Sequence, residues 1–260
     1  MSLYEVVAAR LIGTPLQRPA EWLRKVKGAR FRRRHPELVE VFLEADRTEE
    51  IFRRVLTPAT HCIDIGCHIG AFLQRFVAMA PQGHHYAVEP VPWKARWLRK
   101  KFPTVSLLEM ALGDTAGTSA FFVDASASAY SGVKVRVQPG RVESLQVDCR
   151  RLDDVIPEDA NIGLIKLDVN GGELTVLRGA LQLLRRDRPF VLLGCTEGGL
   201  ADYGFDSDQV HDFLVDEAGF AIYLLKDYLN GGEPLSADAF RHSMTYPFQA
   251  FNYAVTASSP

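Results

Sequence analysis

Apolar residues occur along this chain in two spacings that alternate from about residue 61 onward. Short, mostly apolar runs predict strands at 62–65, 84–89, 105–109, 161–168 and 189–195. Between them, apolar residues recur at steps of three and four, as in 71–80, which predicts amphipathic helices. Strands that alternate with helices indicate βαβ units, and therefore a mostly parallel sheet between two helical layers.

Other segments do not continue this alternation. Short alternating runs at 118–123, 133–137 and 143–147 predict antiparallel strands inserted ahead of the fourth parallel strand, with a small polar loop at 124–132. The last two predicted strands, 220–225 and 248–255, lack a crossover helix between them, so we expect them to pair antiparallel at one edge of the sheet. The fold predicted is a Rossmann-like, doubly wound α/β domain with a mostly parallel seven-stranded sheet and an antiparallel edge strand.

Residues 1–57 read as helices and are predicted to form an N-terminal extension to a domain at 58–260. The stretch 18–34 is strongly basic, with interleaved apolar residues; its cations are Arg18, Arg24, Lys25, Lys27, Arg30, Arg32, Arg33 and Arg34. A platform for an acidic partner and a solvated helical face both fit this pattern, and we favour the solvated face.

Composition narrows the function. The 260 residues are 47% hydrophobic with a net charge of -2, which suits one large α/β domain and argues against a protein that coats nucleic acid or a membrane. No apolar run approaches the length of a membrane span, and the N-terminus lacks the apolar core of a signal peptide, so a cytoplasmic location is expected. A homo-oligomer is left open.

The turn after the first predicted strand is the strongest candidate for a cofactor site. Asp64, Gly66 and Gly70 follow the pattern D-x-G-x-x-x-G, which differs from the G-x-G-x-x-G of pyrophosphate-binding loops. An acid beside closely approaching backbone suits a cationic, hydroxyl-rich cofactor, and S-adenosylmethionine fits this description. Glu89 ends the second strand, where such sheets place the carboxylate that binds a ribose.

Five motifs give the chain a resemblance to the FkbM family of S-adenosylmethionine-dependent methyltransferases over about residues 60–256. They are CIDIGCHIGAF, YAVEP, LEMALGD, RLDDV and, most specifically, IKLDVNGGELTVLRGA. The resemblance implies the class I methyltransferase fold and O-methylation of hydroxyl groups, commonly on sugars, polyketides or other secondary metabolites.

The resemblance also implies roles for individual residues. Asp64, Gly66 and Gly70 would surround the amino-acid part of the cofactor and Glu89 would hold its ribose. The adenine would lie beside Glu109, Met110 and Ala111. The chain departs from the family pattern twice, with Asn170 in place of a glutamate and Gly194 in place of an acid at the end of the fifth strand.

Methyl transfer to a hydroxyl needs an aligned oxygen and a group that removes its proton. Asp168 and Glu197 end the fourth and fifth strands, and His68 lies in the cofactor turn, so these three are the candidate catalytic residues. If the two strands are neighbours, Asp168 and Glu197 would face one cavity and could hold Mg²⁺. We favour a metal-free base over a metal site.

The expected activity is O-methylation of a sugar, oligosaccharide or other small metabolite. A nucleic-acid methyltransferase is an alternative because of the basic N-terminal region, but Asp168-Val169-Asn170-Gly171 lacks the Pro-Pro and aromatic residues typical of enzymes that methylate amino groups. A non-catalytic cofactor-binding scaffold is a second alternative, motivated by Asn170 and Gly194. An NAD-dependent oxidoreductase is disfavoured by the glycine spacing.

Overall fold

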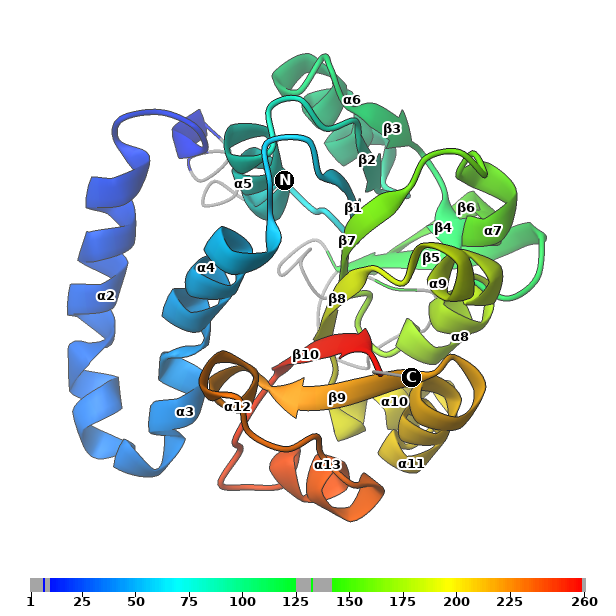
Figure 1. Ribbon diagram of the computed structural model, residues 1–260. Helices are drawn as coiled ribbons and strands as arrows, with labels where there is room; N and C mark the ends of the chain where they lie inside the picture. Colours follow the sequence, from blue (N-terminus) through cyan, green and yellow to red (C-terminus); the bar gives the residue numbers. More distant parts are fainter. Residues whose placement is uncertain (1–6, 8–9, 125–131, 133–141, 259–260) are drawn as a thin grey trace.

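A computed structural model describes residues 7, 10–124, 132 and 142–258 of the chain. Its centre is a seven-stranded sheet of order β3-β2-β1-β7-β8-β10-β9 (Figure 1). The first five of these strands pair in parallel: β3 (Ser106–Leu108), β2 (His85–Val88), β1 (His61–Ile65), β7 (Ile162–Leu167) and β8 (Phe190–Gly194). The order reverses beside β1, which places a crevice at the carboxyl ends of β1 and β7.

The predicted α/β fold is confirmed, including its antiparallel edge. β10 (Asn252–Ala257) pairs antiparallel with both β8 and β9 (Phe220–Leu224). The reversed strand is thus one position in from the edge, and β9 forms the edge itself. Because β10 runs against β8, its first residue, Asn252, lies opposite Gly194 at the carboxyl end of β8.

Helices cover both faces of this sheet, as the mostly apolar strands require. Buried side chains on one face pack with α4 (Glu44–Val55), α5 (Ala71–Met79), α6 (Pro92–Lys101) and α12 (Leu225–Asn230). On the other face they pack with α8 (Glu173–Arg178), α9 (Leu181–Asp187), α10 (Glu197–Tyr203), α11 (Ser207–Asp212), η3 (Phe213–Glu217) and α13 (Ala237–Ser243).

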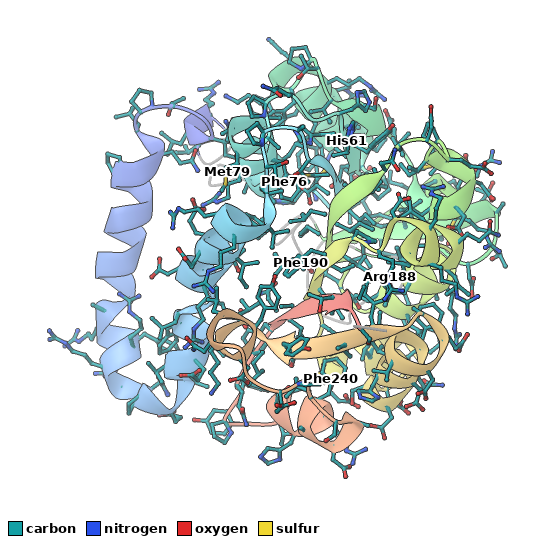
Figure 2. All side chains as sticks on the ribbon, viewed as in Figure 1. His61, Phe76, Met79, Arg188, Phe190 and Phe240 are labelled. Atoms are coloured by element: carbon teal, nitrogen blue, oxygen red, sulfur yellow. The ribbon has the colours of Figure 1, made fainter. Side chains whose placement is uncertain are left out.

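Aromatic side chains pack against each other in both of these helical layers (Figure 2). On the first face, Phe76 of α5 packs edge-on against Phe52, with ring centroids 5.4 Å apart. On the second face, Phe240 of α13 packs against Tyr253 of β10, with centroids 4.8 Å apart. Such pairs add specific geometry to the burial of large apolar surfaces.

A small second sheet of order β4-β6-β5 lies beside the main one. β5 (Gly117–Asp124) and β6 (Val142–Arg150) pair antiparallel and confirm two of the three predicted inserted strands. The third, predicted at 133–137, and most of the loop predicted at 124–132 lie outside the described residues. The sequence pattern missed β4 (Ala111–Leu112), which pairs parallel with β6, and the short helix α7 (Leu152–Val155) that follows β6.

The N-terminal region is helical, as predicted. It comprises α2 (Gln17–Arg34), η1 (Pro36–Leu38), α3 (Val39–Phe42) and α4. In the view of Figure 1, helix α2 lies at the left side of the molecule, and Arg30, Arg33 and Arg34 at its end are exposed. Within the described ranges, the helices are all too short or too polar to cross a bilayer.

Helix α4 is part of the packed core rather than an appendage. Ile51 and Phe52 are fully buried against the sheet. Glu44, at the start of α4, accepts hydrogen bonds from the backbone N–H groups of Phe251 (2.6 Å) and Asn252 (3.0 Å) and from the Asn252 side chain (2.7 Å). The predicted extension therefore contributes residues 44–55 to the same core as β1 and β10.

Glu44→Gln is expected to reduce the pH dependence of stability. Burial raises the pKa of Glu44 above its ordinary value of 4.5, against the opposing effect of its hydrogen bonds. With a raised pKa, the folded protein retains a proton that the unfolded chain releases, so stability declines as the pH rises from about 4.5 through the folded pKa. Urea unfolding between pH 4 and 8 should show a smaller decline in the variant, whereas the exposed control Glu233→Gln should behave as wild type. Equal declines in all three proteins would contradict this.

Candidate active site

A cavity of about 460 Å³ opens at the carboxyl ends of β1, β2 and β7. Its walls come mainly from the loops that follow these strands, with Phe121 of β5 and Tyr203 of α10 completing them. The predicted site residues that line it are Gly66, His68, Glu89, Met110, Ala111 and Asp168. Residues from four separate parts of the sequence therefore meet where a doubly wound sheet binds its ligands.

The two glycines of the first loop are needed for contacts within the protein. Gly66 has φ 74°, and a Cβ there would lie 2.1 Å from the carbonyl oxygen of Asp168. Gly70 has φ 85°, and its Cβ would lie 2.5 Å from Cε2 of Phe102. The sequence suggests that both glycines leave room for a ligand. The fold instead requires them because a side chain at either position would collide with other parts of the protein. Gly66 still lines the cavity, whereas Gly70 is not among the lining residues.

Asp64 lies beneath the loop rather than in the cavity wall. It is completely buried, and its Oδ2 accepts a hydrogen bond from the backbone N–H of Leu73 in α5 (3.1 Å). Its Oδ1 lies 3.6 Å from Nζ of Lys166. Burial raises the pKa of Asp64, and the Lys166 ammonium opposes that rise. The position of Asp64 suits a residue that fixes the cofactor loop and the start of α5.

Lys166 lies directly opposite Asp64 in the β1–β7 pairing. It contacts this buried acid and also lines the cavity. Its Nζ donates to the carbonyl oxygens of Gly66 (3.0 Å) and Ile65 (3.3 Å) and lies 3.9 Å from Oδ2 of Asp168. Burial alone would lower the pKa of this lysine, but the nearby Asp168 and Asp64 carboxylates raise it above the ordinary value. Lys166 therefore remains an ammonium that holds the β1 loop and Asp168 together.

Glu89 is the second buried acid and, unlike Asp64, it does line the cavity. Only 3% of its surface is exposed, and it accepts hydrogen bonds from the backbone N–H groups of His68 (3.0 Å) and Val91 (3.1 Å). Burial raises the pKa of Glu89, while the Lys94 ammonium lowers it. Lys94 is itself buried and lines the cavity, although sequence reasoning did not select it.

Asp168 is the other carboxylate among the described lining residues, and half of its side chain is exposed. Gly194 on the neighbouring strand makes room for it: a Cβ at 194 would lie 3.0 Å from both Cβ and Cγ of Asp168. The missing acid at the end of β8 thus has a steric explanation, because Asp168 fills the space in which a side chain at 194 would begin.

The turn after Asp168 is held rigidly. Asn170 and Gly171 have positive φ of 58° and 109°, and a Cβ at Gly171 would lie 2.0 Å from the carbonyl oxygen of Gly199. The buried Glu173 accepts hydrogen bonds from the backbone N–H groups of Val169 (3.0 Å) and Gly171 (3.1 Å). These contacts fix the position of Asp168, and Asn170 itself lines the cavity.

Glu197 and Asp168 are not brought into one cavity. β7 and β8 are neighbours, as expected, but Glu197 lines a second cavity of about 370 Å³. Across the described ranges, no three or more His, Cys, Asp or Glu side chains form a cluster suited to a metal ion. The expectation that the two acids share a cavity is therefore wrong. β8 ends at Gly194 and α10 begins at Glu197, so Glu197 is the first residue of a helix and lines the second cavity.

The remaining predicted residues divide in the same way. His68, with φ 51°, and Met110 and Ala111 line the first cavity. Glu109 is not among the lining residues; it pairs with Arg99 at 2.7 Å on the exposed side of its loop. Of the three residues expected beside an adenine, Met110 and Ala111 thus line the cavity and Glu109 does not.

Residues 64–222 match the family model described as the methyltransferase FkbM domain. This chain belongs to that family. It is also 30% identical over 145 residues to the 2-O-methyltransferase NoeI of Sinorhizobium fredii, a match that covers 48% of this chain and about three fifths of NoeI (59%). The FkbM resemblance seen in the sequence motifs is therefore confirmed.

Solved structures give more distant similarities. The FkbM methyltransferase of Methylobacillus flagellatus is 15% identical, with 77% of this chain and 44% of that chain covered and a TM-score of 0.45. A TehB-like SAM-dependent methyltransferase from Corynebacterium glutamicum is 13% identical, with 93% and 100% covered and a TM-score of 0.43.

Among the lining residues of this FkbM domain that sequence reasoning missed are Phe72, Lys94 and Tyr203. Phe72 faces the Lys166 ammonium, with Nζ 5.5 Å from the ring centroid. Tyr203 lies at the end of α10, near the turn at Gly171. Lys94 could have been suspected as a lysine within the first turn of the helix that follows Glu89, whereas Phe72 and Tyr203 carry no comparable signal.

Proposed function

We propose that this protein transfers a methyl group from S-adenosylmethionine to a hydroxyl of a sugar, an oligosaccharide or another small metabolite. The observation that carries the proposal is Asp168, a half-exposed carboxylate held beside Lys166 in the cavity of a methyltransferase-family domain. The 2-O-methyltransferase function in the name of NoeI supports oxygen as the accepting atom.

The residues of the cavity fit this cofactor. Its volume is within the range of small-molecule sites. Each oxygen of Glu89 already accepts one backbone N–H and has a further lone pair for a ribose hydroxyl. Met110 and Ala111 offer apolar surface to the adenine. When bound, S-adenosylmethionine supplies an electrophilic methyl group on a sulfonium.

Asp168 is the general base in this proposal. Its exposed carboxylate accepts the proton of the acceptor hydroxyl, while Lys166 and the fixed turn hold it in position. His68 lines the same cavity and is the second candidate base. A divalent cation at Asp168 fits poorly, because the Lys166 ammonium lies 3.9 Å from Oδ2 and would repel it. Glu197, in the other cavity, would not complete such a site.

Calorimetry with S-adenosylmethionine, followed by mass spectrometry of a panel of hydroxylated acceptors, tests the proposal. Binding of the cofactor and a gain of one methyl group by an acceptor are expected, with turnover unchanged by EDTA. A protein that does not bind the cofactor, or that binds it and methylates only amino groups, would refute the proposal.

Glu89→Gln is expected to weaken S-adenosylmethionine binding by about tenfold or more, the scale of losing a hydrogen bond to a charged group. The amide keeps one acceptor oxygen for the loop, so the fold should persist. The control Glu109→Gln replaces an acid that is paired with Arg99 and is not among the lining residues. Calorimetry should show wild-type affinity for this control, and equal affinities for both variants would contradict the role of Glu89.

A further inference from the structure

The second cavity lies at the same edge of the sheet as the first. One side is formed by residues 196–199 and Asp202, at and after the end of β8, and the other by Met244, Phe248 and Phe251, ahead of β10. Asn252 pairs with Gly194, so both sides follow or precede strands at the carboxyl end of the parallel sheet. Helix α10 joins the cavities, because its first residue Glu197 lines the second and its last residue Tyr203 lines the first.

The lining of the second cavity combines aromatic rings with two acids, Glu197 and Asp202. Phe248 and Phe251 are half-buried, and their rings meet at 47° with centroids 5.3 Å apart. Oε2 of Glu197 is buried, and no group in the described part of the chain donates a hydrogen bond to it. The described lining residues include neither lysine, arginine nor histidine. These walls offer apolar contact and a carboxylate acceptor, but no cation for an anionic ligand.

The aromatic side of this cavity is already fixed in place. The backbone N–H of Phe251 donates to Glu44, and the carbonyl oxygen of Phe251 accepts from the N–H of Cys195 (3.0 Å). Earlier in the same loop, the Tyr246 hydroxyl donates to Glu37 (2.6 Å). A binding surface that is ordered beforehand loses less entropy when a ligand binds.

We propose that the second cavity is the acceptor subsite, and that it binds a ring with one apolar face and hydroxyl or ammonium donors at its edge. The apolar face stacks on Phe248 or Phe251, and a donor at the ring edge bonds to the Glu197 carboxylate. A ring that carries a carboxylate or phosphate is rejected, because it would add a further negative charge beside Glu197 and Asp202. This assignment rests on the proposed function, and it makes Glu197 a specificity residue rather than the base.

Gly198 provides a direct way to block the cavity. It lines the cavity, and a Cβ at this position would meet no atom within 4 Å. Gly198 is exposed, so Gly198→Leu should fold, place an apolar side chain at the mouth of the cavity and block ring binding. Gly198→Ala is the matched control that adds a single methyl group. Glu197→Gln should weaken ring binding at least threefold, while Glu233→Gln, at an exposed position elsewhere, should not.

Saturation-transfer NMR with methyl glucoside, glucosamine and glucuronate, with S-adenosylhomocysteine present, tests this subsite. We expect signals from the first two rings and none from glucuronate; a stronger signal from glucoside or from glucosamine distinguishes a neutral from an amine-bearing acceptor. Signals that survive Gly198→Leu, equal signals from glucuronate, or no signal from any ring would overturn the assignment.

Calorimetry with S-adenosylmethionine on the same variants separates the two proposals, because the block lies outside the first cavity. Ring binding without cofactor binding would refute the proposed function and leave the second cavity as a ring-binding site without a role in methyl transfer.

Discussion

Asp168→Asn is expected to lower kcat by about 10²–10⁴-fold, the usual contribution of a general base. The amide has nearly the same size and still fits the space left by Gly194, but it cannot accept the proton of the acceptor hydroxyl. The Asp168 side chain is half-exposed, and its ion pair with Lys166 is long, at 3.9 Å. Replacing Asp168 should therefore leave the fold intact. Initial rates at saturating S-adenosylmethionine measure the effect.

The control is Asp212→Asn on α11, an exposed acid that is not among the lining residues. Its rate should equal that of wild type, and calorimetry should give all three proteins similar affinities for the cofactor. A loss of cofactor binding in Asp168→Asn would assign this carboxylate to the cofactor, whereas full turnover would move the role of base to His68.

Lys166→Met should lower the free energy of unfolding by about 3–5 kcal/mol, the loss typical when one partner of a buried ion pair is removed. Methionine fills a similar volume, so the main effect is electrostatic: Asp64 would lose the nearest cation while remaining completely buried. The carbonyl oxygens of Ile65 and Gly66 would also lose their side-chain donor. Urea unfolding at neutral pH measures the change.

Lys226→Met is the matched control, since Lys226 pairs with Glu40 at 3.2 Å but is about one-third exposed. Ion pairs near the surface contribute about 1 kcal/mol or less, so this variant should remain close to wild type. Comparable losses for the two lysines would show that the Asp64–Lys166 pair does not have the stabilising role inferred for it.

The sheet and its crevice could be predicted from the sequence because their signals are local. Apolar runs ending in Asp64, Glu89 and Asp168 identify strands and the acids at or near their ends. The sequence shows no obvious crossover helix before the last strand, and the antiparallel pairing expected from this is confirmed, although α12 and α13 do lie between β9 and β10. β4 escaped prediction because two residues carry no periodicity. Its strand partner lies more than thirty residues away along the chain.

The site was less predictable because burial and side-chain direction depend on the assembled fold. Asp64 and Glu89 look alike in sequence, yet the first lies beneath the cofactor loop and the second lines the cavity. Likewise, Gly66 is visible as a glycine, but its close approach to the carbonyl of Asp168 appears only when β1 and β7 are paired. The separation of Glu197 from Asp168 follows from the start of α10, which the sequence does not locate.

The path of β10 has a consequence for dividing this chain into fragments. The segment that matches the family ends at residue 222, within β9, yet β10 lies between β8 and β9 and binds Glu44 at its first residue. A truncated gene product restricted to 64–222 would leave a bare edge on β8, separate β9 from its neighbour and remove the α4 packing surface. We therefore expect a fragment that folds by itself to reach at least from Glu44 to the end of β10.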